Sequence, residues 1–493
     1  MNAFKKKALV SAVVAGFGMA AGAAQAVYLN PSGNGATLIY PYYSVQSAGG
    51  NAYNTYVSVV NTTDMVKVVK VRFREGKNSR EVLDFNLYLS PNDVWTGAVV
   101  PAGAGATDPG RLITADNSCT NPGIPATGVN FRNFAYSGAN DDDIGTGLDR
   151  TREGYLEMIE MGELDPTVAP GDAAVHDASG VPDDCPSLRG VTVPAVAAAI
   201  TPPTGGLNGT GTLINVNNGA DMGYNAIALD DLVPISGTDL YADIGDDFPN
   251  FSQFDAVSAT ISGQNAFRSD WLFGEDAVSA VFMHTDVINE YVLDDATLSN
   301  TDWVMTFPTK RYYTPFGAAA ISPFTEDLTE DGACETIEFT YFNREEAGQA
   351  ASDADFSPLP PGGTASALCW ESTVLSIRNG ADHMPTGTAS GVLGSVNSTT
   401  VQVDPAFQNG WANLRFTGLN ATTTGLVTAG ATSDTIDIGG ATVTAGVDHT
   451  YLGLPVTGFM VRTFNNGTLT CGAATCQGNY GSLFDHKFRQ DIF

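Results

Sequence analysis

The sequence predicts an all-β protein made of two β-sandwich domains of immunoglobulin-like type with long loop insertions. Strand-like segments recur about every ten residues over the first hundred positions, a spacing typical of sandwiches and barrels. The 493 residues include 54 Gly and 25 Pro, and no long segment has the apolar period of a helix. Length alone favours two or three domains.

The clearest signal is a strand–turn–strand pattern between residues 66 and 100. Its first strand alternates apolar with basic residues, and its second strand alternates Leu and Phe with polar residues. A side-chain period of two places such rows on opposite faces, so we expect one apolar row facing inward and one cationic row facing outward. The apolar phase slips between Val68 and Val69, which predicts a β-bulge there. The basic row and the adjoining turn contain Lys67, Lys70, Arg72, Arg74 and Lys77.

The remaining strand signals divide the chain into two domains. We expect strands at residues 36–45, 55–62, 65–74, 81–89 and 94–100. Loop-like composition then dominates, so the first domain is expected to span residues 27–310 with an insertion at about 101–265. A second β-rich domain is expected over residues 311–493, where alternating segments are separated by Thr, Gly and Ser.

The N-terminus has the pattern of a secretory signal peptide over residues 1–26. Lys5 to Lys7 are followed by an apolar run and by Ala24-Gln25-Ala26, a small-x-small cleavage site. The apolar run is shorter than the roughly 20 residues that span a bilayer, so we expect cleavage rather than anchoring. No later segment is apolar over that length, and the mature chain is expected to have no transmembrane segment.

The chain is strongly acidic, with a formal net charge of −31. Cleavage after residue 26 would leave 20 basic and 54 acidic residues, and a charge of −34. Such a surface repels nucleic-acid phosphates and anionic lipids, so nucleic acid is not an expected partner. Solubility outside the cell explains the charge, and calcium binding is the alternative.

Six cysteines remain after cleavage, and an even number in an exported chain indicates disulfides. Sequence alone allows 15 connectivities. The spacing favours pairing between neighbours, because each pair brackets a Gly/Pro-rich loop or a short hairpin. The expected pairs are Cys119–Cys185, Cys334–Cys369 and Cys471–Cys476.

One acidic loop is a candidate calcium site. Four acids within nine residues, with two intervening glycines, offer the oxygen ligands that Ca²⁺ prefers. The spacing does not match the EF-hand order, and a solvated acidic loop is the alternative. The candidate ligands are Asp141, Asp142, Asp143 and Asp149.

No catalytic motif stands out, and we expect the protein not to be an enzyme. There is no Gly-x-Ser-x-Gly elbow, no Walker A loop and no His-Glu-x-x-His sequence. Glycoside hydrolysis needs two carboxyl groups across a cleft, which spacing cannot identify among 54 acids. Glu157 and Glu160 are candidates for such a pair, but an outward-facing polar row explains them better.

Two groups of tyrosines, Tyr40 to Tyr43 and Tyr312–Tyr313, are candidates for sugar binding. Tyrosine offers a stacking face and a hydroxyl, although most aromatic residues in strands fill a core.

Three phrases resemble an uncharacterised family of exported, surface-associated bacterial proteins. They are Asn86-Leu-Tyr-Leu-Ser-Pro-Asn-Asp-Val-Trp95, Thr301-Asp-Trp-Val-Met-Thr-Phe-Pro-Thr-Lys-Arg-Tyr-Tyr313 and Gly453-Leu-Pro-Val-Thr-Gly-Phe459. The resemblance implies export and placement at the cell surface, and it implies no catalytic residue.

The leading functional expectation is a secreted or cell-surface structural protein that contributes to an extracellular layer, filament or matrix. A carbohydrate-binding surface module is the alternative, and a secreted hydrolase with paired carboxylates is the third. The expected partners are other copies of the chain or a cell-surface glycan. In the structural hypothesis, the cationic row of residues 67–77 meets the acidic surface of a neighbouring copy.

Overall fold

The structure is a computed structural model, which describes residues 26–191, 193–236, 240–358, 366–380, 389–418, 425–428, 433–437, 442–472 and 474–493. The expected signal peptide lies outside the described residues except for Ala26. Nearly all regular structure is β, arranged in stacked sheets, which confirms the predicted all-β, sandwich-type fold. None of the described helices is long and apolar enough to cross a membrane.

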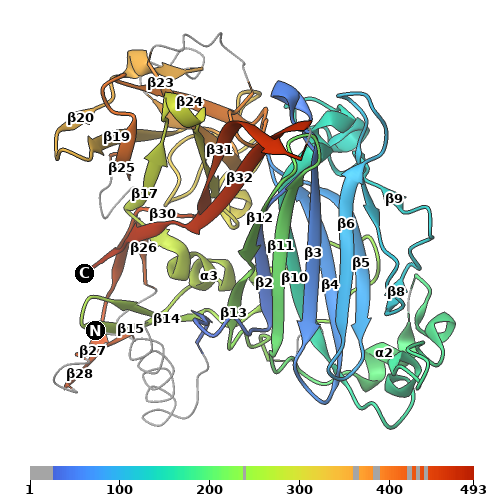
Figure 1. Ribbon diagram of the computed structural model, residues 1–493. Helices are drawn as coiled ribbons and strands as arrows, with labels where there is room; N and C mark the ends of the chain where they lie inside the picture. The colour runs from blue at the N-terminus through green and yellow to red at the C-terminus, as the bar shows by residue number, and fades with distance from the viewer. Residues whose placement is uncertain are drawn as a thin grey trace.

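The N-terminal half forms one sandwich of two sheets, here called N1 and N2 (Figure 1). The strands of N1 in spatial order are β1 (Tyr28–Leu29), β13 (Ile227–Asp230), β2 (Thr37–Ser44), β10 (Glu153–Leu164), β4 (Val66–Glu75), β5 (Glu81–Leu89) and β8 (Cys119–Asn121). Those of N2 are β12 (Ala220–Asn225), β11 (Leu207–Asn215), β3 (Tyr53–Asn61), β6 (Val94–Pro101), β7 (Gly110–Ile113) and β9 (Val129–Asn130).

A second sandwich follows, with sheets C1 and C2. C1 contains β20 (Gly348–Ala350), β19 (Glu335–Asn343), β25 (Asn409–Phe416), β17 (Asp286–Val292) and β33 (Lys487–Arg489), with β22 (Ala367–Leu368) paired to β19. C2 contains β21 (Phe356–Ser357), β24 (Ser398–Val403), β23 (Ser372–Asn379), β18 (Asn300–Thr306), β31 (Thr457–Cys471) and β32 (Ala474–Asp485). Strands β23 and β24 run parallel, whereas β18 is antiparallel to both of its neighbours.

Smaller elements complete the described chain. Three small sheets contain β14 (Val257–Ser262), β15 (Asn265–Asp270), β27 (Ser433–Asp437) and β28 (Thr442–Val447); β16 (Met283–His284) and β30 (Leu454–Pro455); and β26 (Gly425–Val427), β29 (Thr450–Leu452) and β34 (Asp491–Ile492). The α-helices are α2 (Pro194–Ala199), α3 (Gly274–Phe282) and α4 (Lys310–Tyr313). The 3-10 turns are η1 (Ala48–Gly50), η2 (Phe134–Tyr136), η3 (Gly138–Asn140), η4 (Leu148–Arg152), η5 (Gly171–Ala174), η6 (Cys185–Leu188), η7 (Phe251–Gln253), η8 (Asp295–Thr297) and η9 (Asp353–Asp355).

Strand pairing differs from the expected division of the chain. The region expected as an insertion supplies β10 to the middle of N1 and β11 and β12 to N2. Strands β17 and β18 precede residue 310 but pair with strands that follow it. The reason is that strands far apart in sequence meet in these sheets, so the loop-rich stretches between them do not mark structural boundaries.

Two hydrophobic cores hold the sandwiches together. One lies between N1 and N2, and it extends to Val304, Val374 and Phe459 on the outer face of C2. The other fills the C-terminal sandwich and continues past α3 to the opposite face of N1, where it includes Val66 and Val68. Figure 1 shows α3 at this junction and the β31–β32 hairpin beside β12. The two sandwiches are therefore joined by continuous packing.

The phase slip at Val68–Val69 has a structural explanation. Val66 and Val68 contribute to one core and Val69 to the other, because β4 is buried along its whole length. The register between β4 and β10 does shift here, between Val68 and Val69, but the extra residue is Met161 in β10. The predicted irregularity is thus present on the partner strand.

Candidate functional site

The cationic row of β4 is buried, so the prediction that it faces solvent and contacts another copy is wrong. Lys67, Lys70, Arg72 and Arg74 are all at most 3 % exposed. Residues 243–249 cover part of this row, since their backbone carbonyls accept hydrogen bonds from Lys70 and Arg72. Lys77 in the adjoining turn is half-buried, and its ammonium lies 4.9 Å from the centre of the Trp370 ring. The alternation predicted two faces correctly, but both faces of N1 are covered.

Carboxylates on neighbouring strands neutralise these cations. Lys67 pairs with Glu160 at 2.8 Å and also with Glu163, and Arg74 pairs with Glu157 at 2.8 Å. Glu157 and Glu160 are thus buried counter-ions, not the outward-facing row predicted for them. They bind different cations, so they do not form the carboxyl pair of a glycoside hydrolase. Lys70 and Arg72 pair in the same way with Asp84 and Glu81 on β5.

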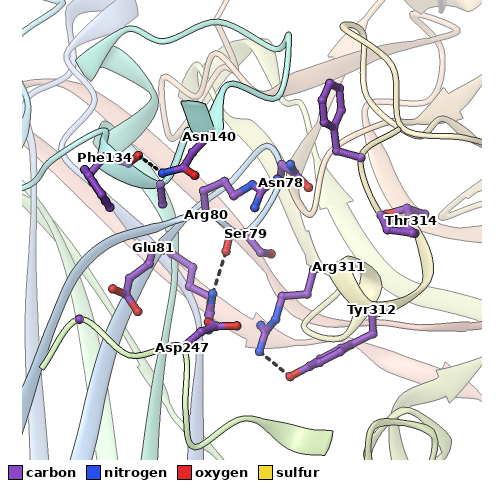
Figure 2. Close-up of a pocket in the computed structure, with 15 residues that line it drawn as sticks. Asn78, Ser79, Arg80, Glu81, Phe134, Asn140, Asp247, Arg311, Tyr312 and Thr314 are labelled. Atoms are coloured by element: carbon purple, nitrogen blue, oxygen red, sulfur yellow. Dashed lines mark hydrogen bonds and ion pairs between the residues drawn. The ribbon is translucent and has the colours of Figure 1, made fainter. Parts of the chain in front are cut away.

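Where this ion-pair network reaches the second sandwich, a polar pocket of about 640 Å³ opens. Its walls are the end of β4 with the turn into β5, the loop carrying η2 and η3, residues 245–247, and α4 with the three residues that follow it. Figure 2 shows Arg80, Arg311 and Asp247 around one space, with Phe134 and Tyr312 on opposite sides of it. Both sandwiches therefore contribute to the pocket.

Glu157, which is buried, joins two of the arginines that line the pocket. One of its carboxylate oxygens accepts from Arg74 Nε at 2.8 Å, and the other accepts from Arg311 Nη1 at 2.6 Å. Burial would raise the pKa of Glu157, but the guanidinium groups of Arg311 and Arg74 outweigh it and lower the pKa to about 2. Arg74 and Arg311 are therefore held by a charged, buried carboxylate that lies between them.

Tyr155, Ser79 and Glu371 continue this network, and Ser79 is one of the residues that line the pocket. Tyr155 Oη donates to Ser79 Oγ at 2.9 Å, and Ser79 Oγ donates to Glu371 Oε2. Burial raises the pKa of Glu371 to about 7. A hydroxyl beside such a carboxyl can act as a nucleophile, but Ser79 is only 2 % exposed and its hydroxyl is held between two partners. We therefore conclude that these hydrogen bonds hold the β4–β5 turn against the start of β23.

The rim of the pocket combines aromatic rings with charged groups. Phe134 is 78 % exposed and Phe316 is 41 % exposed, which is unusual for rings of this size. The side chains of Arg80 and Asp247 are 36 % and 70 % exposed. The rim therefore presents apolar faces and planar polar groups to a common space, as small-molecule sites do.

The candidate calcium loop is organised around an arginine. Asp142 is buried, and its two oxygens accept from Arg150 at 2.7 and 2.9 Å. Asp141 accepts from the backbone N–H of Asp143, and Asp149 is exposed in η4. No cluster of three or more His, Cys, Asp or Glu side chains suited to a metal ion is found in the described parts of the chain. Calcium binding stays a prediction without a supporting cluster.

All three predicted disulfides are present: Cys119–Cys185, Cys334–Cys369 and Cys471–Cys476. The first ties the loop before α2 to β8 at the edge of N1. The second joins Cys334, just before β19, to Cys369, which lies between β22 and β23.

The two tyrosine groups have different roles. Tyr40, Tyr42 and Tyr43 are fully buried in the core of the first sandwich, so they cannot stack on a sugar from solvent. Tyr313 is buried beside α3 and donates to Asp276, whereas Tyr312 lines the pocket and hydrogen-bonds Arg311. Only one of the five candidates is thus placed at the pocket.

Sequence reasoning missed Arg80, Phe134, Asp247 and Arg311, the residues that define the pocket. One signal was present, because β10 carries Glu153, Glu157, Glu160 and Glu163 while β4 carries four basic residues. Two strands of opposite charge at similar spacing indicate mutual pairing, and hence burial, of both rows. Nothing in the sequence indicates that residues 134, 247 and 311 converge there.

No family model, curated protein or solved structure matches this chain.

Proposed function

We propose that this chain is an exported surface protein that binds a saccharide in the pocket between its sandwiches. The observation that carries the proposal is the placement of two exposed phenylalanines, Phe134 and Phe316, around arginine and carboxylate side chains. An aromatic face stacks on the C–H face of a sugar ring, while planar polar groups bind adjacent hydroxyls in pairs.

The rigidity and the size of the pocket support the binding of a small-molecule ligand. Arg74 and Arg311, which line the pocket, are both paired to the buried carboxylate of Glu157, so they are held in place before a ligand arrives. Preorganised groups lose little freedom on binding, which favours affinity. The volume of about 640 Å³ lies within the range of small-molecule pockets.

A glycan array probed with the labelled full-length protein tests the proposal. We expect retention on a limited set of glycans, and a loss of about fivefold in affinity for Phe134→Ala, since one aromatic contact contributes roughly 1 kcal/mol. Phe273→Ala is the matched control, because Phe273 is 54 % exposed and does not line the pocket. No retained glycan, or equal loss in both variants, would contradict the proposal. Release of shortened product would instead favour the hydrolase.

A structural role in an extracellular layer is the second candidate. The observation that favours it is the continuous packing of both sandwiches, supplemented by three disulfides, which gives a stiff building block. Negative-stain microscopy of the purified protein with and without Ca²⁺ tests it. Ordered arrays or filaments are expected, and a persistent monomer under both conditions counts against the layer.

A further inference from the structure

We infer that the ligand of this pocket is an acidic saccharide, whose carboxylate binds Arg80. The inference rests on the proposed function and adds the chemical class of the ligand. It is carried by an arginine whose hydrogen-bonding capacity is unused and by Asp247, a carboxylate that lines the same pocket and pairs with Arg74.

The guanidinium of Arg80 has N–H groups that are available to a ligand. Its guanidinium makes no hydrogen bond among the described residues, and its Nε is buried without a partner. Its one acidic neighbour is Asp142, with 3.6 Å between Arg80 Nε and Asp142 Oδ2. Both oxygens of Asp142 already accept from Arg150, and Oδ2 also accepts from Asn78 at 2.9 Å. Because a guanidinium without hydrogen bonds is costly at a partly buried position, an external acceptor is favoured.

Asp247 shows which kind of acceptor the pocket favours. Its side chain is 70 % exposed, and one of its oxygens lies 3.3 Å from Arg74 Nη2. Partial burial alone would raise its pKa, but Arg74 and Arg311 outweigh that effect, so the pKa of Asp247 lies below its ordinary value. The space between these arginines therefore has a positive potential that stabilises a carboxylate.

The other groups at the pocket favour a ligand with hydroxyls and with no more than one charge on each sugar ring. Asp247 lines the pocket as a carboxylate, so it would repel a dianionic phosphate more strongly than a carboxylate with one charge. Burial raises the pKa of Glu81 to about 7, so Glu81 adds less to this repulsion. Both carboxyl groups accept hydrogen bonds from hydroxyls, and Phe134 offers a face for a ring. A planar carboxylate matches the two-pronged donor geometry of a guanidinium, whereas a neutral sugar leaves Arg80 without a charged partner.

Isothermal titration of the full-length protein with trigalacturonate and with the neutral galactotriose tests the inference. We expect trigalacturonate to bind at least tenfold more tightly, since a charge-assisted bidentate pair contributes roughly one such factor. Arg80→Gln should remove that preference, and Asp247→Asn should strengthen trigalacturonate binding about threefold or more by removing a competing anion. Arg344→Gln is the control, because Arg344 is exposed and does not line the pocket.

Three results would overturn the inference. These are equal affinity for the acidic and neutral trisaccharides, no effect of Arg80→Gln on trigalacturonate, and displacement of trigalacturonate by an equal concentration of sulfate, which would indicate an unselective anion site. If another, neutral glycan binds the array and Phe134→Ala weakens it, the acidic ligand is excluded while the proposed function stands. If no glycan binds in either experiment, both fail.

Discussion

Replacing Glu157 by Gln should destabilise the whole protein, because this one carboxylate holds an arginine from each sandwich. Its oxygens accept from Arg74 Nε at 2.8 Å and from Arg311 Nη1 at 2.6 Å, and the side chain is fully buried. Gln keeps the size of the side chain but removes the charge, and its amide nitrogen would face a guanidinium donor. Arg74 then keeps only the exposed Asp247 as an ion-pair partner among the described residues, and Arg311 loses its one such partner.

The magnitude follows from the pKa of the carboxyl group. A pKa lowered from 4.5 to about 2 in the folded protein corresponds to about 3 kcal/mol of stabilisation at neutral pH, at about 1.4 kcal/mol per unit. Breaking a buried ion pair by removing one partner costs about 3–5 kcal/mol, which agrees. We therefore expect Glu157→Gln to lower the free energy of unfolding by about 3 kcal/mol or more.

The same pKa predicts how acid affects the two proteins. Because the folded pKa of Glu157 lies below its unfolded value, its contribution is fully present above pH 4.5 and disappears as pH falls toward 2. About 2 kcal/mol of it should be lost by pH 3 in the wild type. In Glu157→Gln this part of the acid sensitivity should be missing, so the curves of stability against pH should converge in acid.

Urea unfolding followed by tryptophan fluorescence, at pH 7 and at pH 3.5, measures both effects. Glu345→Gln is the control, because Glu345 is exposed in the turn after β19. A difference below about 1 kcal/mol at pH 7 would place Glu157→Gln in the range of ordinary surface substitutions and refute the reasoning. Equal acid sensitivity of Glu157→Gln and wild type would refute it independently.

Three further predictions concern stability. Burial raises the pKa of Glu371 to about 7, so its ionised form opposes folding as pH rises from about 4.5 to 7. Between pH 5 and pH 8, Glu371→Gln should therefore gain stability over wild type, by up to about 3 kcal/mol. Thermal melts across that pH range measure the gain. Replacing both cysteines of a disulfide with serine should cost about 4 kcal/mol for Cys334–Cys369, whose sequence separation is 35, but only about 2 kcal/mol for Cys471–Cys476, whose separation is 5. Equal losses of stability in denaturant titrations would contradict this order. In Gly154→Ala the new Cβ would lie 2.0 Å from the backbone oxygen of Arg74, so the β4–β10 pairing must shift and the melting temperature should fall by several degrees. Gly180→Ala is the comparison: its Cβ would have open space, but its φ is positive, so we expect a loss of about 1 kcal/mol in the free energy of unfolding.

Local patterns predicted the strands well because turn chemistry and a period of two act between neighbours. The expected strand at residues 81–89 is β5, Glu81–Leu89, and the strand expected at residues 65–74 is β4, Val66–Glu75. The neighbour pairing of all six cysteines is likewise confirmed. These features depend on residues close in the chain.

The environment of the basic row could not be predicted in the same way. Alternation shows that Arg72 and Arg74 point away from Val71 and Phe73, but not what covers them. Arg72 donates to carbonyls of residues 246–249, and Arg74 shares Glu157 with Arg311, more than 230 positions away. The pocket is formed by residues that are far apart in the sequence, so no local sequence pattern identifies them.

The shared cores also bear on how the chain reaches its native state. Tyr53 Oη donates to the carbonyl of Val392, 339 positions later, and Glu153 accepts from the backbone N–H groups of Val396 and Asn397. Because synthesis starts at the N-terminus, most of the strands of N1 and N2 are made before residues 392–397 have been synthesised. Val304, Val374 and Phe459 then arrive last to close a core that the first sandwich leaves open at one end. Contacts of such long range make folding slow, and the early sandwich exposes an apolar surface until residues 300–460 have joined it.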